Sequence, residues 1–113
     1  ILKKKEFWKN EFYISKNVLI PRPESEHLVE EALKLITKNQ NKKLLEIGIG
    51  SGCLIISILK ERKNCFGIGI DCCKKAIKTA NINANLHQIQ NPYLPSFQYA
   101  LNHFLCIPKS YYH

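Results

Sequence analysis

The sequence predicts an α/β fold with a parallel β-α-β-α core, and three observations support this prediction. Two short apolar runs, residues 44–47 and 65–70, have the length and composition of buried strands. Each is followed by a segment of helical periodicity, and strands that alternate with helices pair in parallel through right-handed crossovers. Three glycines at alternate positions separate the first strand from its helix. A chain of 113 residues, 45% of them hydrophobic, is long enough for one domain but not for two.

The segment ahead of this core is expected to form a strand or hairpin that leads into a proline-rich loop. Aromatic side chains alternate loosely with polar ones over residues 7–13, before the apolar run 18–20. The segment 21–26, PRPESE, is expected to be extended because each proline fixes its own φ and disfavours the α region in the preceding residue. Ser25 can serve as the N-cap of the helix that follows. The apolar face of that helix consists of Leu28, Val29, Ala32, Leu33 and Ile36.

The core elements follow in order. The strand 44–47 is expected to be buried, and the helix after the glycines, CLIISIL, is apolar nearly all round, as expected for a helix packed on a sheet. Asp71 ends the second strand. Residues 91–113 hold three of the five prolines and six of the eleven Phe, Trp and Tyr residues, and no clean period predicts a third strand there. The helix after Asp71 has one apolar face, formed by Ala76, Ile77, Ala80 and Ala84.

Composition excludes some classes of protein. The net charge of +8 would suit an anionic partner such as RNA or DNA, but the lysines are scattered, which is more typical of solvated surfaces. Five cysteines without a Cys-x-x-Cys pair indicate neither a disulfide framework nor a zinc site, and they fit a reducing cytoplasm. No metal site is expected. No apolar run reaches 18 residues, so no membrane span is expected and the chain should be soluble.

The glycines suggest a ligand site at the carboxyl ends of the strands. A glycine loop between a strand and a helix turns sharply and approaches a ligand closely, while the helix N-terminus offers unpaired N–H groups. The dinucleotide fingerprint fails, because its sixth position is Cys53 instead of glycine. The pattern Glu46-x-Gly48-x-Gly50-x-Gly52 instead resembles the first motif of Rossmann-like S-adenosylmethionine-dependent methyltransferases. The alternative is a plain strand-to-helix turn followed by an aspartate that caps the next helix.

In that class the cofactor has a ribose with two free hydroxyls and no pyrophosphate. Asp71 lies 19 residues past Gly52 and has the reach to accept hydrogen bonds from both hydroxyls, since a carboxylate is a bidentate acceptor. The three segments EFW, LIPRPESE and LLEIGIGSGC, within residues 6–90, resemble the protein-(glutamine-N5) methyltransferases of peptide-chain release factors, the HemK-type family.

This resemblance implies a partial class I methyltransferase fold, S-adenosylmethionine as cofactor, and methyl transfer to the glutamine of a Gly-Gly-Gln loop in a release factor. By the same resemblance, Phe12 and the loop residues Arg22, Pro23 and Glu24 would lie on the substrate side. Plain core packing is the alternative for Phe12 and its aromatic neighbours, and a surface ion pair is the alternative for Arg22. The resemblance assigns the cofactor to Glu46, Gly48, Ile49, Gly50, Ser51, Gly52 and Asp71.

The family's catalytic Asn-Pro-Pro-Tyr motif has no counterpart here. Asn91-Pro92-Tyr93 is one proline short and only about 20 residues past Asp71, about half the family's spacing, so it reads as a chance turn and no catalytic residue is assigned. We therefore expect a truncated, catalytically incomplete chain whose half sheet leaves an unpaired apolar edge. Its expected parts are a lead-in hairpin and loop (1–24), a cofactor-binding half (25–90) and a non-family tail (91–113), a frame-shift product or disordered.

Two other functions stay open. One is a fragment of a nucleic-acid adenine N6 methyltransferase, in which a similar motif presents the exocyclic amine, and the net charge of +8 favours it. The other is a non-catalytic remnant that binds RNA through its basic surface, with weak nucleic-acid contact. The sequence does not determine the oligomeric state.

Overall fold

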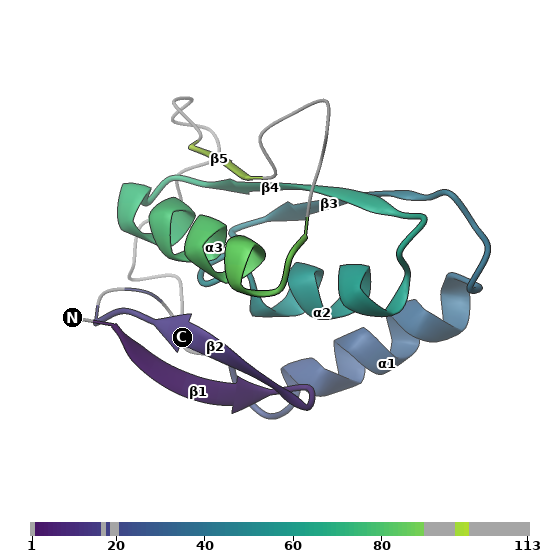
Figure 1. The fold of residues 1–113 in the computed structure, drawn as a ribbon, viewed down its shortest axis with the longest axis horizontal. Coiled ribbons are helices and arrows are strands. Elements are labelled where there is room, and N and C mark those ends of the chain that lie inside the picture. Colours follow the sequence, from purple (N-terminus) through teal and green to yellow (C-terminus); the bar gives the residue numbers. More distant parts are fainter. Residues whose placement is uncertain (1, 17, 19–20, 90–96, 100–113) are drawn as a thin grey trace.

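The computed structural model of the chain describes residues 2–16, 18, 21–89 and 97–99. An antiparallel hairpin opens the fold, and helices then alternate with the strands of a second sheet (Figure 1). The hairpin and the first helix are β1 (Lys3–Phe7), β2 (Asn10–Ile14) and α1 (Ser25–Leu35). The remaining elements are β3 (Lys43–Ile47), α2 (Cys53–Glu61), β4 (Phe66–Asp71), α3 (Lys74–Leu86) and β5 (Phe97–Tyr99).

The predicted parallel core is confirmed. Strands β3 and β4 pair in parallel from Lys43 opposite Phe66 to Ile47 opposite Ile70, and α2 connects them. Strand β5 adds a third parallel strand on the far side of β4, with Gly69 opposite Phe97. The sequence did not predict β5, because three residues are too few to produce a recognisable period.

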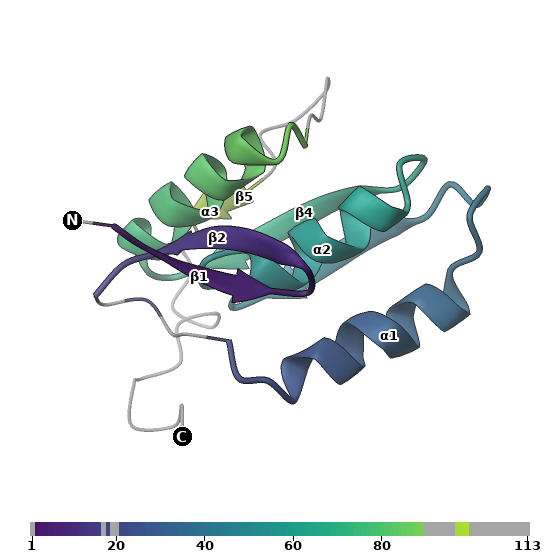
Figure 2. The same cartoon turned by 60° about the horizontal axis from the view of Figure 1, so that its bottom comes forward.

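The sheet has one covered and one open face within the described residues. Gly67 faces the helices so closely that an added Cβ would lie 2.7 Å from Ile55 Cδ1, so a larger residue there would require the Ile55 and Leu59 side chains to shift. On the opposite face, Leu45 and Ile47 are 61% and 56% exposed. The predicted burial of the strand at 44–47 is therefore wrong for Leu45 and Ile47, because α1, α2 and α3 all lie on the other side of the sheet (Figures 1 and 2). A parallel sheet is normally covered on both faces.

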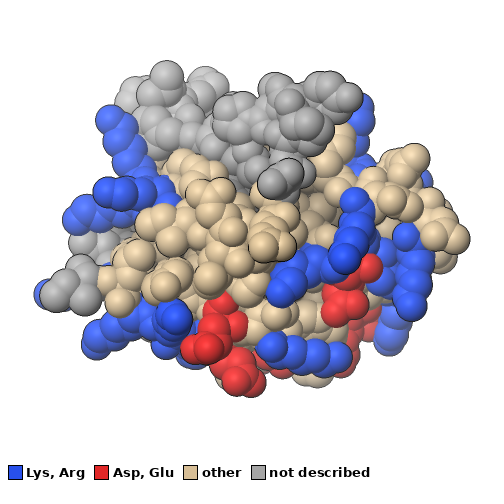
Figure 3. Space-filling model, in the orientation of Figure 1, with Lys and Arg blue, Asp and Glu red and all other residues tan. Residues whose placement is uncertain are grey.

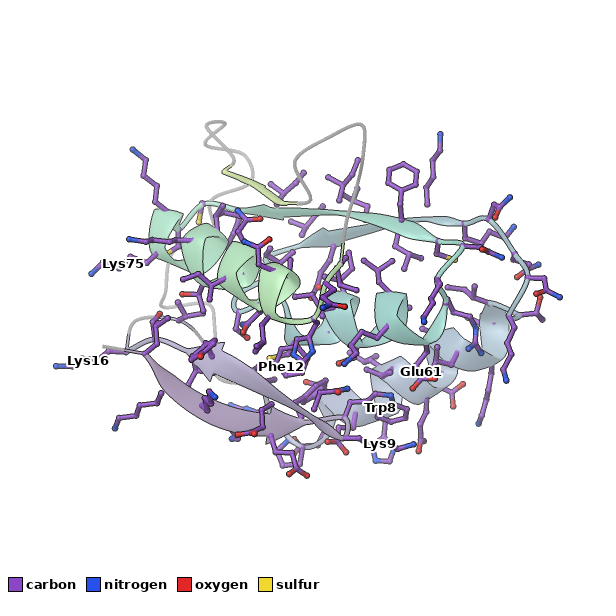
Figure 4. The ribbon with its side chains drawn as sticks, viewed as in Figure 1. Trp8, Lys9, Phe12, Lys16, Glu61 and Lys75 are labelled. Carbon is purple, nitrogen blue, oxygen red and sulfur yellow. The ribbon has the colours of Figure 1, made fainter. Side chains whose placement is uncertain are left out.

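Helices α2 and α3 lie between this sheet and the hairpin, and α1 lies beyond α2, beside the hairpin turn, as the two views together show. Phe12 is fully buried and points from β2 toward the helices (Figure 4). Its ring meets Phe7 edge-on at 6.3 Å between centroids and lies 4.6 Å from the His87 ring.

The prediction that α2 is a helix packed against protein is confirmed, since five consecutive residues from Ile55 to Leu59 are buried. The buried face of α3 contains Ala76, Ala80 and Ala84, also as predicted.

The predicted strand or hairpin at the start of the chain is a hairpin with a two-residue turn. Trp8 and Lys9 form this turn with φ values of 49° and 68°, a region that suits the twist of hairpins but is unusual for residues other than glycine and asparagine. The Trp8 N–H donates to Glu26 Oε1 at 3.0 Å, and Asn10 Nδ2 donates to the Trp8 carbonyl at 3.0 Å. The turn is therefore held from α1 as well as from the hairpin itself.

The proline segment and α1 differ from the predictions in two respects. Residues 23–24 form a turn rather than extended chain, with hydrogen bonds from the Ser25 N–H to the Arg22 carbonyl (2.9 Å) and from the Glu26 N–H to the Pro23 carbonyl (3.1 Å). The N-cap is Glu24, without a side-chain cap bond, and not Ser25. A proline φ also suits the first turn of a helix, which explains why the extended conformation ends before Pro23.

A buried arginine joins the ends of α1 and α2. Arg62 donates through Nη2 to the Leu33 carbonyl at 2.8 Å, through Nε to the Ile36 carbonyl, and through Nη1 to the Glu61 carbonyl at 3.1 Å.

The predicted apolar face of α1 is correct for Val29 and Ile36, which are buried, but wrong for Leu28, which is exposed. None of the helices in the described part of the chain has the length and apolar composition needed to cross a membrane.

Candidate functional site

The loop between β3 and α2 depends on its three glycines. Gly48, Gly50 and Gly52 have φ values of 76°, 56° and 84°, a region that side-chain-bearing L residues avoid. The Gly48 N–H donates to the Ile70 carbonyl at 2.7 Å, so the loop stays attached to the end of β4 as it leaves β3. The loop therefore lies at the carboxyl end of the parallel strands and leads directly into the N-terminus of α2.

The first and last of these glycines have different surroundings. An added Cβ at Gly52 would lie 3.0 Å from Ile56 Cδ1 and 3.2 Å from Ala80 Cβ, so this glycine permits the close approach of α2 and α3. A Cβ added at Gly48 would meet no atom of the described residues within 4 Å. The loop is thus packed against protein on its α2 side and has open space beside Gly48.

Asp71 links the ends of the two strands. Its Oδ2 accepts a hydrogen bond from the Gly50 N–H at 3.0 Å, and its Oδ1 accepts one from the Cys73 N–H at 2.9 Å. Cys73 is the N-cap of α3, so the carboxylate orders the start of this helix and the glycine loop at once. Each carboxylate oxygen has two lone pairs, and therefore both oxygens keep capacity to accept a further hydrogen bond.

Glu46 is a half-buried acid beside the loop. Burial raises its pKa from 4.5 to about 7; the Ile55 backbone N–H opposes this rise, and the charge of Asp71 adds to it. Its Oε1 is buried and has no hydrogen-bond partner among the described residues. An unpaired buried oxygen is costly, so ionisation of Glu46 is favoured only when a donor or a cation approaches its carboxylate.

The structure gathers all seven residues of the predicted cofactor set at this edge of the sheet, but their side chains differ in access. Ile49 and Ser51 are buried, and Ser51 Oγ lies 2.9 Å from Cys53 Sγ. These two residues can present only their backbone to a ligand. In the substrate-side set, Arg22, Pro23 and Glu24 are exposed at the turn before α1, whereas Phe12 belongs to the hydrophobic core, which favours the core alternative for it.

Asn83 is a residue at this site that the sequence analysis missed. It is fully buried on α3 and hydrogen-bonds to both the hairpin and the glycine loop. The available signal was an asparagine on the helix face otherwise made of Ala76, Ala80 and Ala84, where a buried polar group needs partners.

A cavity of about 520 Å³ lies elsewhere, at the other end of the helices. Its lining includes Lys60, Lys63, Cys65 and His87, and it contains no residue of the predicted site. Lys60 is already engaged there, since its Nζ lies 2.8 Å from Asn10 Oδ1 and 3.0 Å from His87 Nδ1. We therefore place the candidate site at the glycine loop.

Comparison with known proteins supports the resemblance inferred from the sequence. No protein-family model matches the chain. Release factor glutamine methyltransferases match it: that of Buchnera aphidicola is 42% identical over 87 residues, which are 77% of this chain and 31% of that protein. The protein of Flavobacterium psychrophilum is 44% identical over 92 residues (79% and 32%), and that of Coxiella burnetii is 41% identical over 91 residues (80% and 33%).

A solved structure adds evidence on the fold alone. Precorrin-8w decarboxylase of Methanobacterium thermoautotrophicum superposes with a TM-score of 0.58 at 17% identity, covering 79% of this chain and 44% of that structure. The chain spans about a third of the length of the curated relatives described above. Over about three quarters of its own length, the chain is homologous to the release factor glutamine methyltransferases.

Proposed function

We propose that the chain forms the cofactor-binding part of an S-adenosylmethionine-dependent methyltransferase that acts on the glutamine of a Gly-Gly-Gln motif in a peptide-chain release factor. The observation that best supports this function is the bond from Gly50 to Asp71, which joins a loop of positive-φ glycines to the acid that ends the next strand. The names of the relatives support the substrate. In this proposal, β3, β4 and β5 with the helices on one face are part of a Rossmann-like methyltransferase fold.

Three features of the site would hold the cofactor. Asp71 has free lone pairs for the ribose hydroxyls, and the half-buried Glu46 carboxylate would pair with the cationic amino-acid end. The open space beside Gly48 allows close approach to the backbone of the loop. The cofactor itself supplies the methyl group, activated on a sulfonium.

We assign no catalytic residue to this chain. In the proposed organisation, residues 1–24 form the lead-in hairpin and loop, and residues 25–90 form the cofactor-binding part. Residues 91–113 lie outside the family sequence, although β5 at Phe97–Tyr99 pairs with the sheet. The Asn91-Pro92-Tyr93 segment lies outside the described residues. The expected compartment is the cytoplasm.

Equilibrium dialysis with labelled S-adenosylmethionine tests the cofactor. We expect saturable binding by the 113-residue chain, and at least about tenfold weaker binding by Asp71→Ala, because a hydrogen bond to a charged group contributes about 1.5–3 kcal/mol. Glu30→Ala is the matched control, since it removes the same charge from an exposed position on α1. No binding by the folded chain, or equal binding by Asp71→Ala, would refute the proposal.

The net charge of +8 favours a second candidate, the methylation of adenine in nucleic acid. In Figure 3 the lysine and arginine side chains are spread around the visible face instead of forming one patch, which weakens this candidate. Competition between a Gly-Gly-Gln peptide and an adenine oligonucleotide distinguishes the two substrates. Salt-sensitive RNA binding without affinity for S-adenosylmethionine would instead indicate a non-catalytic RNA-binding remnant.

A further inference from the structure

Asn83 on α3 bonds to two segments that are far away in the sequence. Its Oδ1 accepts a hydrogen bond from the Tyr13 N–H at 2.7 Å, and its Nδ2 donates to the Tyr13 carbonyl at 2.9 Å. The second Nδ2 proton is donated to the Ser51 carbonyl at 2.8 Å. One buried amide thus pairs with the outer edge of β2 and, at the same time, with the middle of the glycine loop.

The orientation of this amide follows from its partners. The Tyr13 N–H needs an acceptor, while the carbonyls of Tyr13 and Ser51 both need a donor. A flipped Asn83 amide would place its oxygen against two carbonyls and its NH2 group against an N–H. Since Asn83 has no exposed surface, water cannot relieve such a mismatch, and only one arrangement satisfies all three bonds.

The bond to Ser51 acts at the part of the loop with the least intrinsic conformational preference. Ser51 lies between Gly50 and Gly52, both at positive φ, and glycine populates many backbone conformations. The direction of the Ser51 carbonyl therefore depends on its partner, Asn83. Because the same amide holds Tyr13, a shift of the hairpin is transmitted to this carbonyl.

We propose that Asn83 is a positioning residue that couples docking of the β1–β2 hairpin to the conformation of the glycine loop. The ligand side of this inference rests on the proposed function, in which the loop binds S-adenosylmethionine. Coupling between two sites is reciprocal. A ligand that needs the observed loop conformation therefore strengthens docking of the hairpin, and a docked hairpin strengthens binding of the ligand.

Other hairpin contacts provide a matched control. Thr79 Oγ1 lies 3.4 Å from Ser15 Oγ and donates to the Lys75 carbonyl at 2.9 Å, and His87 Nε2 lies 2.7 Å from the Glu11 carbonyl. These contacts join the hairpin to α3, but none of these hydrogen bonds reaches the glycine loop. Thr79→Val is nearly isosteric and removes the contact to Ser15, the residue that follows β2, so it loosens the hairpin without removing the bond between Asn83 and Ser51.

The first test uses hydrogen exchange and needs no ligand. In Asn83→Ser, which shortens the side chain, we expect the Gly52 and Tyr13 N–H groups to exchange at least about tenfold faster, a typical size for coupling between sites. In Thr79→Val, where Asn83 still joins the two segments, we expect the Tyr13 and Gly52 N–H groups to accelerate together and by the same, smaller factor. Unchanged exchange at Gly52 in a folded Asn83→Ser chain would overturn the proposal.

A wild-type measurement decides the question if Asn83→Ser does not fold. In native-state exchange across a denaturant series, the Tyr13 and Gly52 N–H groups should open with the same free energy and the same denaturant dependence. Two separate opening reactions would overturn the coupling.

The second test measures affinity for S-adenosylmethionine. We expect Asn83→Ser to weaken binding at least about fivefold, Thr79→Val to weaken it less, and saturation of the wild type to slow exchange at Tyr13. Equal affinities of the two variants would overturn the positioning role. If the wild type binds no cofactor, the proposed function fails by itself, whereas the exchange results still decide whether the hairpin and the loop are coupled.

Discussion

Replacing Glu46 with glutamine is expected to stabilise the free chain at neutral and alkaline pH and to weaken its binding of S-adenosylmethionine. The pKa of the half-buried Glu46 carboxyl is raised from 4.5 to about 7, chiefly by desolvation. Between these two values the native chain holds a proton that the unfolded chain has lost. The free energy of unfolding therefore falls as the pH rises through this range and levels off above about 7.

The size of this effect follows from the pKa difference. Each pKa unit corresponds to about 1.4 kcal/mol, so the rise from 4.5 to about 7 amounts to about 3 kcal/mol of stability lost by pH 8. Glutamine resembles the protonated acid and does not ionise, so Glu46→Gln avoids this loss. The difference in stability between variant and wild type should be small at pH 5 and should grow to about 3 kcal/mol at pH 8.

Ligand binding should change in the opposite direction. If the Glu46 carboxylate pairs with the cationic end of the cofactor, the ionised form binds and the protonated form does not. The ionised fraction rises from about one tenth at pH 6 to about nine tenths at pH 8, so the affinity of the wild type should rise about tenfold. Glu46→Gln should bind more weakly than the wild type at pH 8 and show a flat profile.

Urea unfolding followed by circular dichroism at pH 5, 6, 7 and 8 provides the stability measurement, and dialysis at pH 6 and 8 provides the affinities. Titrations of other groups cancel when the two chains are compared at each pH. Glu30→Gln, at an exposed position on α1, is the control and should follow the wild type. A Glu46→Gln chain less stable than the wild type at pH 8, or affinities independent of pH in the wild type, would refute the reasoning.

Three further substitutions test the loop and the helix layer. Gly48→Ala should cost only about 1–2 kcal/mol of stability, the backbone strain at φ 76°, because its Cβ meets no atom in the described part of the chain, yet it should weaken cofactor binding. Gly52→Ala adds contacts of 3.0 and 3.2 Å to this strain and should cost about 2–5 kcal/mol in urea unfolding; equal losses for the two variants would contradict the packing difference. Arg62→Met should lose about 3 kcal/mol, because the final carbonyls of α1 lose their buried donors, whereas the exposed Arg22→Met should change stability by less than about 0.5 kcal/mol. Similar thermal midpoints for these two arginine variants would show that Arg62 does not hold α1.

Local patterns in the sequence predicted much of the fold and the position of the site. The apolar helix CLIISIL and the strand ending at Asp71 are recognisable because elements covered by protein on several sides are apolar along most of their length. The three glycines are informative because positive φ is costly for every other common residue, and the structure has all three in that region. Their spacing relative to Asp71 places the site at the ends of the strands.

Other features depended on contacts between distant segments. Trp8 and Lys9 form a tight turn without glycine or asparagine, since Glu26 on α1 accepts the Trp8 N–H. The exposure of Leu45 on an apolar strand depends on which face of the sheet the helices cover. Strand β5 depends on pairing with β4, not on a period of its own.

By itself, the sequence determined the strand and helix order, the glycine turn and the acid that faces it, because each depends on the conformational preferences or burial of neighbouring residues. Only the tertiary structure decided that Asp71 bonds to Gly50, that Glu46 holds an unpaired buried oxygen, and that Asn83 joins the hairpin to the loop. The physical reason is that hydrogen bonds and desolvation depend on groups brought together from distant parts of the chain. The periodic pattern of a short segment therefore contains no information about these contacts between distant groups.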